Sequence, residues 1–536
     1  MKTQSSNRLW YVAIALGWLF DFLFWKQAPG INFALFATLC LLGGFYLLLA
    51  DGLRPSHKSL ILLPFFAFFA VMSFVRAEPM TTFLSYILTL FVMAVFSATY
   101  LGGNWIRYSL ADYLGRSLNL LASMIARPIS FAAEVRKVQA ESGVVPVKRN
   151  IWPIIRGVII ALPIVAIFAT LLASADVIFS QRLDDLIKLF NLEKLPEYIF
   201  RLIYILVFGY ALAGTFLHSA SQSNEEKLIG EDKPAIPPFL GFTETSIVLG
   251  SVVILFAFFV VIQFQYFFGG QTNIHIDGYT YSEYAVRGFG ELVTVAFFAL
   301  LLLLGLSAIT CRESEIQRRI FSGLGVTLVA LVLVMLVSAY QRLGLYEAVY
   351  GFSRLRTYTH VFLIWIGLLL VATIVLEILR KERSFALAAV IASFGFAISL
   401  SLLNVDAFIV NQNIHREISV SNSSNLPERV ALDAQYFLDL SDDAVPALTN
   451  AYRTPSLPDA VKEKVGVALA CIRQQRQTGS REHPWQSFRV SRLIADNDLA
   501  SLNKELNQYK INDANWPVKV TTPKGDEFSC YANYYN

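Results

Sequence analysis

The chain has 536 residues, of which 55% are hydrophobic and only 16% are charged, and its formal net charge is +4. A soluble globular protein carries about 25% charged residues, so this composition excludes an ordinary series of soluble domains. The small positive excess is concentrated in particular loops, which indicates membrane topology and not a nucleic-acid surface.

Apolar stretches of the length that a helix needs to cross a bilayer recur along the first 403 residues. Stretches this long exclude a barrel, so the sequence predicts an all-α polytopic membrane protein with about eleven transmembrane helices and the lipid bilayer as its surroundings. The first stretch has no cleavage site after it and carries Asp21, so we expect it to be retained. The predicted spans are 9–25, 32–50, 59–75, 82–101, 153–175, 198–218, 243–266, 288–309, 320–339, 359–379 and 385–403.

The distribution of lysine and arginine predicts the orientation. With the N-terminus inside, the inner segments hold nineteen of these residues and the outer loops hold nine. Positive residues are retained on the cytoplasmic side of a membrane, so this asymmetry favours a cytoplasmic N-terminus. An odd number of spans then predicts that the C-terminal residues lie outside.

The longest predicted cytoplasmic segment, about 103–150, has an amphipathic pattern. Its apolar residues at helical spacing are Leu114, Leu118, Leu121, Ile125 and Ile129, and its arginines include Arg116, Arg127 and Arg136. This pattern is typical of a helix lying in the membrane interface. It is equally typical of a helix packed under the bundle, and Pro128 would break or kink the helix in either case.

After residue 404 the composition becomes polar, which predicts a domain boundary there and a small, mainly helical extracytoplasmic domain over 404–536. Its only two cysteines are Cys471 and Cys530. In an oxidising compartment these two can form a disulfide. Two unrelated buried thiols are the alternative.

Catalytic signatures are largely missing from the sequence. The six histidines are scattered without metal-ligand spacing, and no Walker loop, complete Rossmann fingerprint or Cys-x-x-Cys motif occurs. The sequence therefore predicts neither a metal nor a cofactor.

Polar residues gather instead at the span ends that the topology assigns to the outer face. Glu283, Arg287 and Glu291 would share one helix face, since they are four residues apart. The full set of candidate residues is Asp21, Asp176, Glu283, Arg287, Glu291, Arg342, Glu347, Arg354, Arg356, Asp406 and Arg416.

Two interpretations of this set are open. An ionisable residue at the hydrocarbon edge is unfavourable unless it is paired, so these groups either line a shared wet cavity or pair with one another. In the first case Arg342, Arg354 and Arg356 could grip a carboxylate or phosphate in bidentate fashion. In the second case Glu347 pairs with an arginine and Asp406 caps the exit from the last span, a purely structural role.

Several short motifs recur in a fixed order along most of the chain. They are Asp21-Phe22-Leu23, Pro29-Gly30-Ile31-Asn32, Arg156-Gly157 to Pro163, Ala173 to Asp176, Phe268-Gly269-Gly270, Tyr281 to Glu291, Leu345 to Gly351, Arg354-Leu355-Arg356, Asn404-Val405-Asp406 with Asn413 and Arg416, and Asp443 to Leu448. With them the chain resembles a family of bacterial polytopic membrane proteins catalogued as domain of unknown function 4173, related to 4153. After Trp485, Phe488 and Arg489 depart from that pattern, in which tryptophan and asparagine are expected. The resemblance implies a location in the bacterial cytoplasmic membrane and no particular reaction.

Three hypotheses for the function follow. The leading one is a non-enzymatic envelope sensor or assembly factor, whose outer polar site engages an envelope component or a partner membrane protein. A transporter is the second, although predicted spans 2, 8, 9 and 11 carry no ionisable residue in their central portions. The third is a glycosyl- or acyl-transferase with a lipid-linked donor and Asp21 as its acidic residue, although the first outer loop is only about six residues long.

Overall fold

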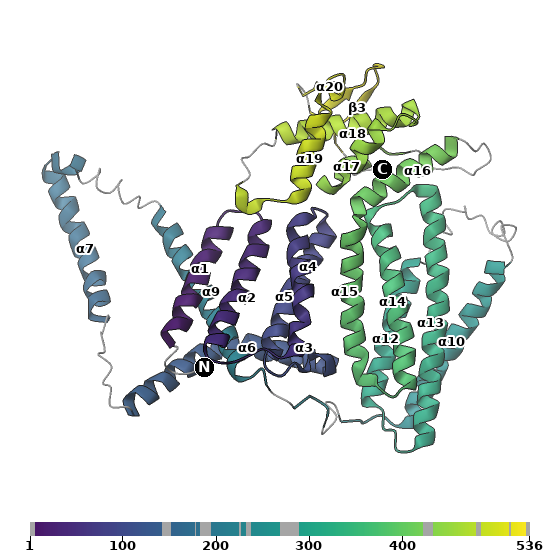
Figure 1. The fold of residues 1–536 in the computed structure, drawn as a ribbon, viewed down its shortest axis with the longest axis horizontal. Helices are drawn as coiled ribbons and strands as arrows, with labels where there is room; N and C mark the ends of the chain where they lie inside the picture. The colour runs from purple at the N-terminus through teal and green to yellow at the C-terminus, as the bar shows by residue number, and fades with distance from the viewer. Residues whose placement is uncertain are drawn as a thin grey trace. The chain divides into compact units, whose positions relative to one another are not determined.

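A computed structural model describes residues 6–141, 152–176, 178–182, 194–224, 227–231, 237–268, 289–421, 432–478, 484–513 and 516–531. The chain divides into two compact units. Unit 1 comprises Met1–Lys26, Thr38–Arg54 and Leu118–Ser223, and unit 2 comprises Gln27–Ala37, Pro55–Ser117 and Asn224–Asn536. Figure 1 shows the elements of both units.

Unit 1 is built around a close pairing of its first and last helices. Its elements are α1 (Ser6–Phe24), most of α2 (Ile31–Ala50), α6 (Leu110–Glu141) from Leu118 onward, α7 (Trp152–Ala175) and α9 (Leu195–Ser221). A Cβ on Gly17 would lie 2.4 Å from the carbonyl oxygen of Ile205, and one on Gly209 would lie 2.9 Å from that of Ala13. The two glycines therefore allow α1 and α9 to approach to backbone contact, as small residues do between membrane helices.

The helices of unit 2 before residue 404 form a second bundle. They are α3 (His57–Leu60), α4 (Leu62–Val75), α5 (Pro79–Thr99), η2 (Asn104–Arg107), α10 (Phe242–Phe268), α12 (Phe289–Ile309), α13 (Glu315–Tyr350), α14 (Arg354–Ile378), η5 (Glu382–Ser384) and α15 (Phe385–Leu403). Leu249, Leu303, Leu328 and Leu370 are buried where α10, α12, α13 and α14 meet.

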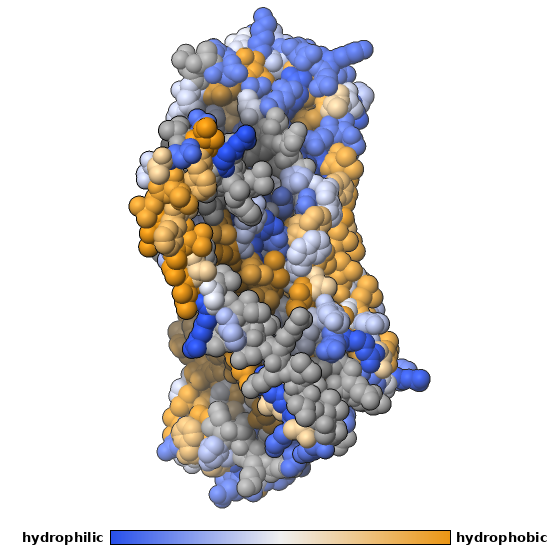
Figure 2. Space-filling view, turned by 90° about the vertical axis from the view of Figure 1, so that its left-hand side faces the viewer, coloured by the Kyte–Doolittle hydropathy of each residue, from blue (hydrophilic) through white to orange (hydrophobic). Residues whose placement is uncertain are grey.

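Ten described helices are long and apolar enough to cross a membrane. This confirms the predicted all-α polytopic membrane protein. Nine of the ten coincide with predicted spans, and the tenth is Leu110–Val138 of α6. The predicted span 9–25 corresponds to α1, which is not among the ten, and α7 contributes the shorter apolar helix Pro163–Ala175. On the face shown in Figure 2, hydrophobic and hydrophilic residues gather in separate areas.

Two helices run further than the sequence suggested. Pro128, which was expected to break or kink its helix, does not break α6, which continues from Leu110 to Glu141. Residues 340–350 are not a loop between spans, because α13 runs to Tyr350 and ends only at Gly351, whose φ of 80° is left-handed. The amide of Gly351 donates to the carbonyl of Glu347 and closes the last turn.

The residues after 404 begin with α16, which follows a left-handed Asn404. Their elements are α16 (Val405–Ser421), η6 (Tyr436–Asp439), η7 (Asp442–Ala444), α17 (Val445–Arg453), α18 (Asp459–Thr478), η8 (Trp485–Ser487), α19 (Val490–Ser501), α20 (Asn503–Leu506), β1 (Lys510–Asn512), β2 (Lys519–Thr521) and β3 (Glu527–Ser529). The three strands form a small antiparallel sheet in the order β1-β2-β3, which the sequence did not predict.

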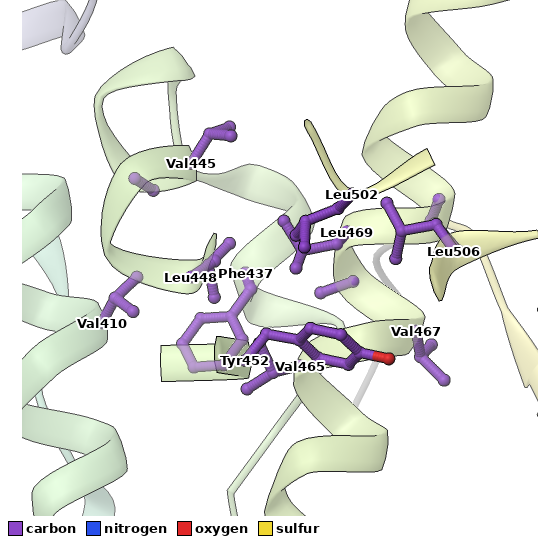
Figure 3. Packing of buried hydrophobic residues seen from close by; sticks show 14 of the residues in the cluster. Val410, Phe437, Val445, Leu448, Tyr452, Val465, Val467, Leu469, Leu502 and Leu506 are labelled. Carbon is purple, nitrogen blue, oxygen red and sulfur yellow. The ribbon is translucent and has the colours of Figure 1, made fainter. Parts of the chain in front are cut away.

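These C-terminal elements share one hydrophobic core. Figure 3 shows Phe437, Leu448, Leu469 and Leu506 converging from η6, α17, α18 and α20, with Val410 of α16 at one edge. Cys471 of α18 is joined by a disulfide to Cys530, which follows β3. Because α16 contributes to this core and also follows α15 directly, it connects the C-terminal elements to the bundle of unit 2.

Candidate functional site

An ion pair connects the start of α14 to the start of α16. The Arg354 guanidinium donates from Nε to Oδ1 of Asp406 at 2.8 Å and from Nη2 to Oδ2 at 2.6 Å. Asp406 is completely buried, and its Oδ2 also accepts from the backbone amide of Ser441 at 2.7 Å. The backbone amide of Arg354 donates to the Tyr436 hydroxyl at 3.0 Å. The pair therefore holds two helix starts and the C-terminal segment 436–441 together.

A second buried carboxylate lies at the start of α5. Glu78 caps this helix, since it accepts from the amides of Met80 and Thr81 at 2.9 and 2.8 Å. The Tyr358 hydroxyl of α14 also donates to Glu78. Among the ion pairs of the described residues, none involves Glu78. The groups that donate hydrogen bonds to this carboxylate are therefore all neutral.

A third carboxylate, Asp443 of η7, binds the turn before α5. Its Oδ2 accepts from the amides of Ala77 and Glu78 at 2.7 and 3.0 Å, and Arg76 lies 3.7 Å from its Oδ1. Arg76 also donates to the carbonyl of Ser401 at 2.9 Å. Burial raises the pKa of Asp443 above its ordinary value, against the lowering influence of these amides and of Arg76.

We name this group the junction cluster: Arg76, Glu78, Arg354, Tyr358, Asp406, Tyr436 and Asp443. Its residues come from the α4–α5 turn, α14, α16 and the segment 436–443, all in unit 2. Three buried carboxyl groups face two guanidinium groups, so the cluster carries an excess of acid. The hydrogen bonds of its side chains join them to one another, to backbone groups and to the Ser441 hydroxyl, so the cluster forms a connected network.

The turn between α13 and α14 is clamped by α16. The Asn413 side chain accepts from the amide of Phe352 at 2.7 Å and donates to its carbonyl at 2.9 Å. Arg416 donates to the carbonyl of Val349 at 2.8 Å. Arg356 donates to the carbonyl of Gly351 and lies 4.0 Å from the ring centre of Tyr346. The motif 345–356 therefore forms the corner between α13 and α14, and side chains of α16 hold this corner in place.

Glu347 forms a pair of its own beside this corner. Its Oε1 lies 3.0 Å from Nδ1 of His360, and the ring of Tyr340 packs edge-on against the His360 ring at 4.6 Å. Arg342 is half-buried on α13. The partner that the sequence predicted for Glu347 was an arginine, and the structure places a histidine there instead.

The short loop after α1 contacts the C-terminal segment within unit 2. The amide of Ile31 donates to the carbonyl of Phe488 at 3.0 Å, and Ser487 and Arg489 donate to the carbonyls of Ala28 and Pro29. A Cβ on Gly30 would lie 2.7 Å from the backbone carbon of Ser487. The stretch that departs from the expected family pattern is therefore the one that binds the first loop, through the Phe488 carbonyl and the side chains of Ser487 and Arg489.

Asp21 belongs to a separate network in unit 1. It accepts from Nε and Nη2 of Arg201 at 2.8 and 2.5 Å and from the Tyr204 hydroxyl. Trp25 donates to Glu197 at 2.8 Å and also lies under the Arg201 guanidinium. Both oxygens of Asp21 are engaged, so any proton transfer by this carboxylate would first require that the pair opens.

The remaining candidates are not brought together. Asp176 is exposed and accepts from the amides of Ile178 and Phe179 just after it. Glu291 is exposed on α12, and Glu283 and Arg287 lie outside the described residues. Of the eleven candidates, the structure joins Arg354 to Asp406 directly and gathers Glu347, Arg356 and Arg416 around the nearby corner.

Five residues of the junction cluster were not among the candidates from the sequence: Arg76, Glu78, Tyr358, Tyr436 and Asp443. Glu78 carried a recognisable signal, since an acidic residue directly before a proline is typical of a helix start. Asp443 opens one of the sequence motifs but was not counted as a candidate residue. Arg76 and Tyr358 carried no signal, because a single arginine or tyrosine at a span end resembles many others.

Two pockets lie elsewhere in unit 2. One, of about 530 Å³, is apolar and lies between α10 and α12, where Phe256 and Phe298 line it. The other, of about 440 Å³, lies between α18 and α19 and is lined by Arg473, Arg476 and Asp496. Over the described residues, no group of three or more histidine, cysteine, aspartate or glutamate side chains is arranged to hold a metal ion.

Comparison with known proteins gives one match. A family model described as Domain of unknown function (DUF4153) spans residues 63–451. Family 4173, which the motifs resembled, is a related but different family, so the match supports the expected family of unknown function and not family 4173 itself. Neither a curated protein nor a solved structure matches the chain significantly.

Proposed function

The chain belongs to the family described as Domain of unknown function (DUF4153), and we propose that it is a non-enzymatic envelope sensor or assembly factor in which the junction cluster couples the C-terminal domain to the membrane bundle. The observation that carries this proposal is the Arg354–Asp406 pair with its third partner, the amide of Ser441. One carboxylate thereby links α14, α16 and the C-terminal segment.

The connected network of the cluster supports a coupling role. Asp406, Glu78 and Asp443 are all almost completely buried and are bonded to protein groups. A buried ion network can satisfy its charges and hydrogen bonds in only a few arrangements, so a change in one side chain forces its partners to rearrange. A ligand or partner that moves segment 436–443 would therefore disturb the starts of α5 and α14.

Contacts within unit 2 support the proposed orientation, with a cytoplasmic N-terminus and the C-terminal domain outside. Arg383 pairs with Asp112 at 2.5 Å, and Arg107 pairs with Glu231 at 2.7 Å, which joins three segments counted as cytoplasmic. The junction cluster joins only segments that the predicted topology places on the outer face. The Cys471–Cys530 disulfide is also compatible with an oxidising compartment outside the cytoplasmic membrane.

The position of buried ionisable groups favours a sensor or assembly factor over a transporter. Glu347, Glu377 and Asp21 lie near the ends of α13, α14 and α1. A transporter of charged solutes places such groups near the middle of the bilayer. The observed placement is typical of ionisable groups that hold loops and helix ends together.

The proposal is tested in a strain that lacks the chain and shows an envelope defect. Full-length protein with Arg354→Met and Asp406→Asn, which removes both charges of the pair, should fail to correct the defect although it accumulates as folded protein. Exposed Glu291→Gln serves as the control, since it removes an acidic side chain outside the junction cluster. If the double variant corrects the defect like the unchanged chain, or if purified protein turns over a polyprenyl-linked donor, the proposal is wrong.

A further inference from the structure

Over the residues that the structure describes, nothing covers the apolar stripe of α6. Leu114, Leu118, Leu121, Ile125 and Ile129 are between 55% and 69% exposed. They recur every three or four residues, so they lie on one side of the helix. A helix packed under the bundle would bury this stripe, so that alternative from the sequence does not hold.

A second side of α6 packs on protein. Leu120, Phe131 and Val135 are at least nine-tenths buried. In unit 1, Ser123 hydrogen-bonds His218 of α9 at 2.8 Å, and a Cβ on Gly214 of α9 would lie 2.6 Å from the carbonyl oxygen of Met124. That carbonyl is the one that Pro128 leaves without its helical partner.

A third side of α6 is polar. Ser130, Glu134 and Lys137 are exposed, and Asn119 is half-buried on the same side. At about 100° per residue, the centre of the apolar stripe lies roughly 140° from the polar side and roughly 115° from the packed side. The helix thus has one apolar surface, one polar surface and one surface that packs on protein. A helix that lies in the membrane interface beside a helical bundle needs these three surfaces.

A membrane-spanning α6 fits these observations less well. It meets the length and composition criterion, but with the lowest mean hydropathy of the ten helices. It touches α9 around Gly214, seven residues before the end of that helix, and does not pack along it as α1 does. Figure 1 shows α6 at a steep angle to α1 and α9. A spanning helix would also expose Glu134 and Lys137 to lipid.

We propose that α6 lies in the interface of the bilayer, at the end of α9 that carries Ser221, and binds the surface of an anionic leaflet. The stripe from Leu114 to Ile129 enters the acyl boundary. Arg136 and Lys137 at the far end of the helix attract phosphate headgroups. The partner is therefore a lipid surface, and this inference stands independently of the proposed sensor function.

The experiment uses the full-length chain in vesicles of phosphatidylcholine with or without phosphatidylglycerol. In a background of Cys40→Ala and Cys311→Ser, which keeps the disulfide, single cysteines replace Leu118 or Ile125 on the stripe and Ser130 on the polar side. Each carries an environment-sensitive fluorophore. Quenching is measured with nitroxides attached to shallow or deep positions of the lipid chains.

The expected result is strong quenching of the Leu118→Cys and Ile125→Cys labels by the shallow nitroxide and weak quenching by the deep one. The Ser130→Cys label should be quenched by neither. Phosphatidylglycerol should increase the shallow quenching, and Arg136→Glu with Lys137→Glu should cancel that increase. Three results would overturn the inference: stripe labels that report water, stripe labels shielded from both nitroxides, or deep quenching at both Ile125→Cys and Ser130→Cys, which a spanning helix would give.

Discussion

Arg354, the first residue of α14, and Asp406, in the first turn of α16, form a bidentate ion pair across 52 residues of sequence. The pair joins the helical bundle of unit 2 to the C-terminal residues, because the same carboxylate binds the amide of Ser441. The junction cluster around it contains side chains from three of the sequence motifs, 354–356, 404–406 and 443–448.

Arg354→Met should lower the free energy of unfolding by about 3–5 kcal/mol, because it leaves the buried Asp406 carboxylate without its cation. Arg354→Met combined with Asp406→Asn should recover most of the loss, since the amide oxygen can still accept from Ser441. Thermal unfolding of purified full-length protein measures both effects. A double variant as unstable as the single one would show that the two residues do not act as a pair.

Asp443 should make the stability of the folded chain depend on pH. Its pKa is raised by burial above the ordinary value of 3.8, so the folded protein binds this proton more tightly than the unfolded chain does. The corresponding stability is complete below pH 3.8 and is lost as the pH rises through the raised pKa.

Asp443→Asn keeps an oxygen for the amides of Ala77 and Glu78 and removes the ionisation. Its melting temperature should therefore exceed that of the unchanged chain at neutral pH and converge with it in acid. Asp443→Ala, which removes the acceptor, should be less stable at every pH. An Asp443→Asn variant that melts at a lower temperature than the unchanged chain at neutral pH would contradict the prediction that burying the ionised Asp443 is unfavourable.

Gly351→Ala should lower stability by about 1–3 kcal/mol, because Gly351 has a left-handed φ of 80° and the new Cβ would lie 2.7 Å from Oδ1 of Asn413. Gly367→Ala, in the middle of α14 with no atom within 4 Å of its Cβ, should be neutral or slightly stabilising. Melting curves of the two variants provide the comparison. Equal changes in melting temperature would mean that neither the left-handed backbone nor the close contact with Asn413 requires a glycine at residue 351.

The denatured, unreduced chain should show two titratable thiols, Cys40 and Cys311, and four after reduction. Cys530→Ser should lower the stability of the C-terminal core by about 2–5 kcal/mol, since the disulfide closes a loop of 59 residues. Cys311→Ser is the matched control and should leave the C-terminal core unchanged. Four free thiols in unreduced protein from native membranes would contradict the pairing.

The spans were predictable because a bilayer requires long apolar segments, and this requirement is local in sequence. Nine of the ten membrane-length helices were located in this way. Helix ends were less predictable: α13 continues through Tyr340 and Arg342 to Tyr350, because tertiary contacts with α14 and α16 bury one side of an otherwise polar stretch.

The partners within the candidate site were not predictable, because they depend on long-range packing. Arg354 and Asp406 were both recognised as candidates, but their pairing follows from how α14 and α16 start next to each other. The pairing of Asp21 with Arg201 needs the backbone contact between α1 and α9 at Gly17. The small sheet β1–β3 was missed because its strands are only three residues long.

The most direct test of the coupling role is the cellular activity of the Arg354→Met, Asp406→Asn variant, whose stability should be close to that of the unchanged chain. In the strain that lacks the chain, we expect this folded variant to leave the envelope defect uncorrected, because the ion pair that couples the C-terminal domain to the bundle is gone. Full correction of the defect by the same folded variant would contradict the proposed coupling role and leave the junction cluster with a structural role only.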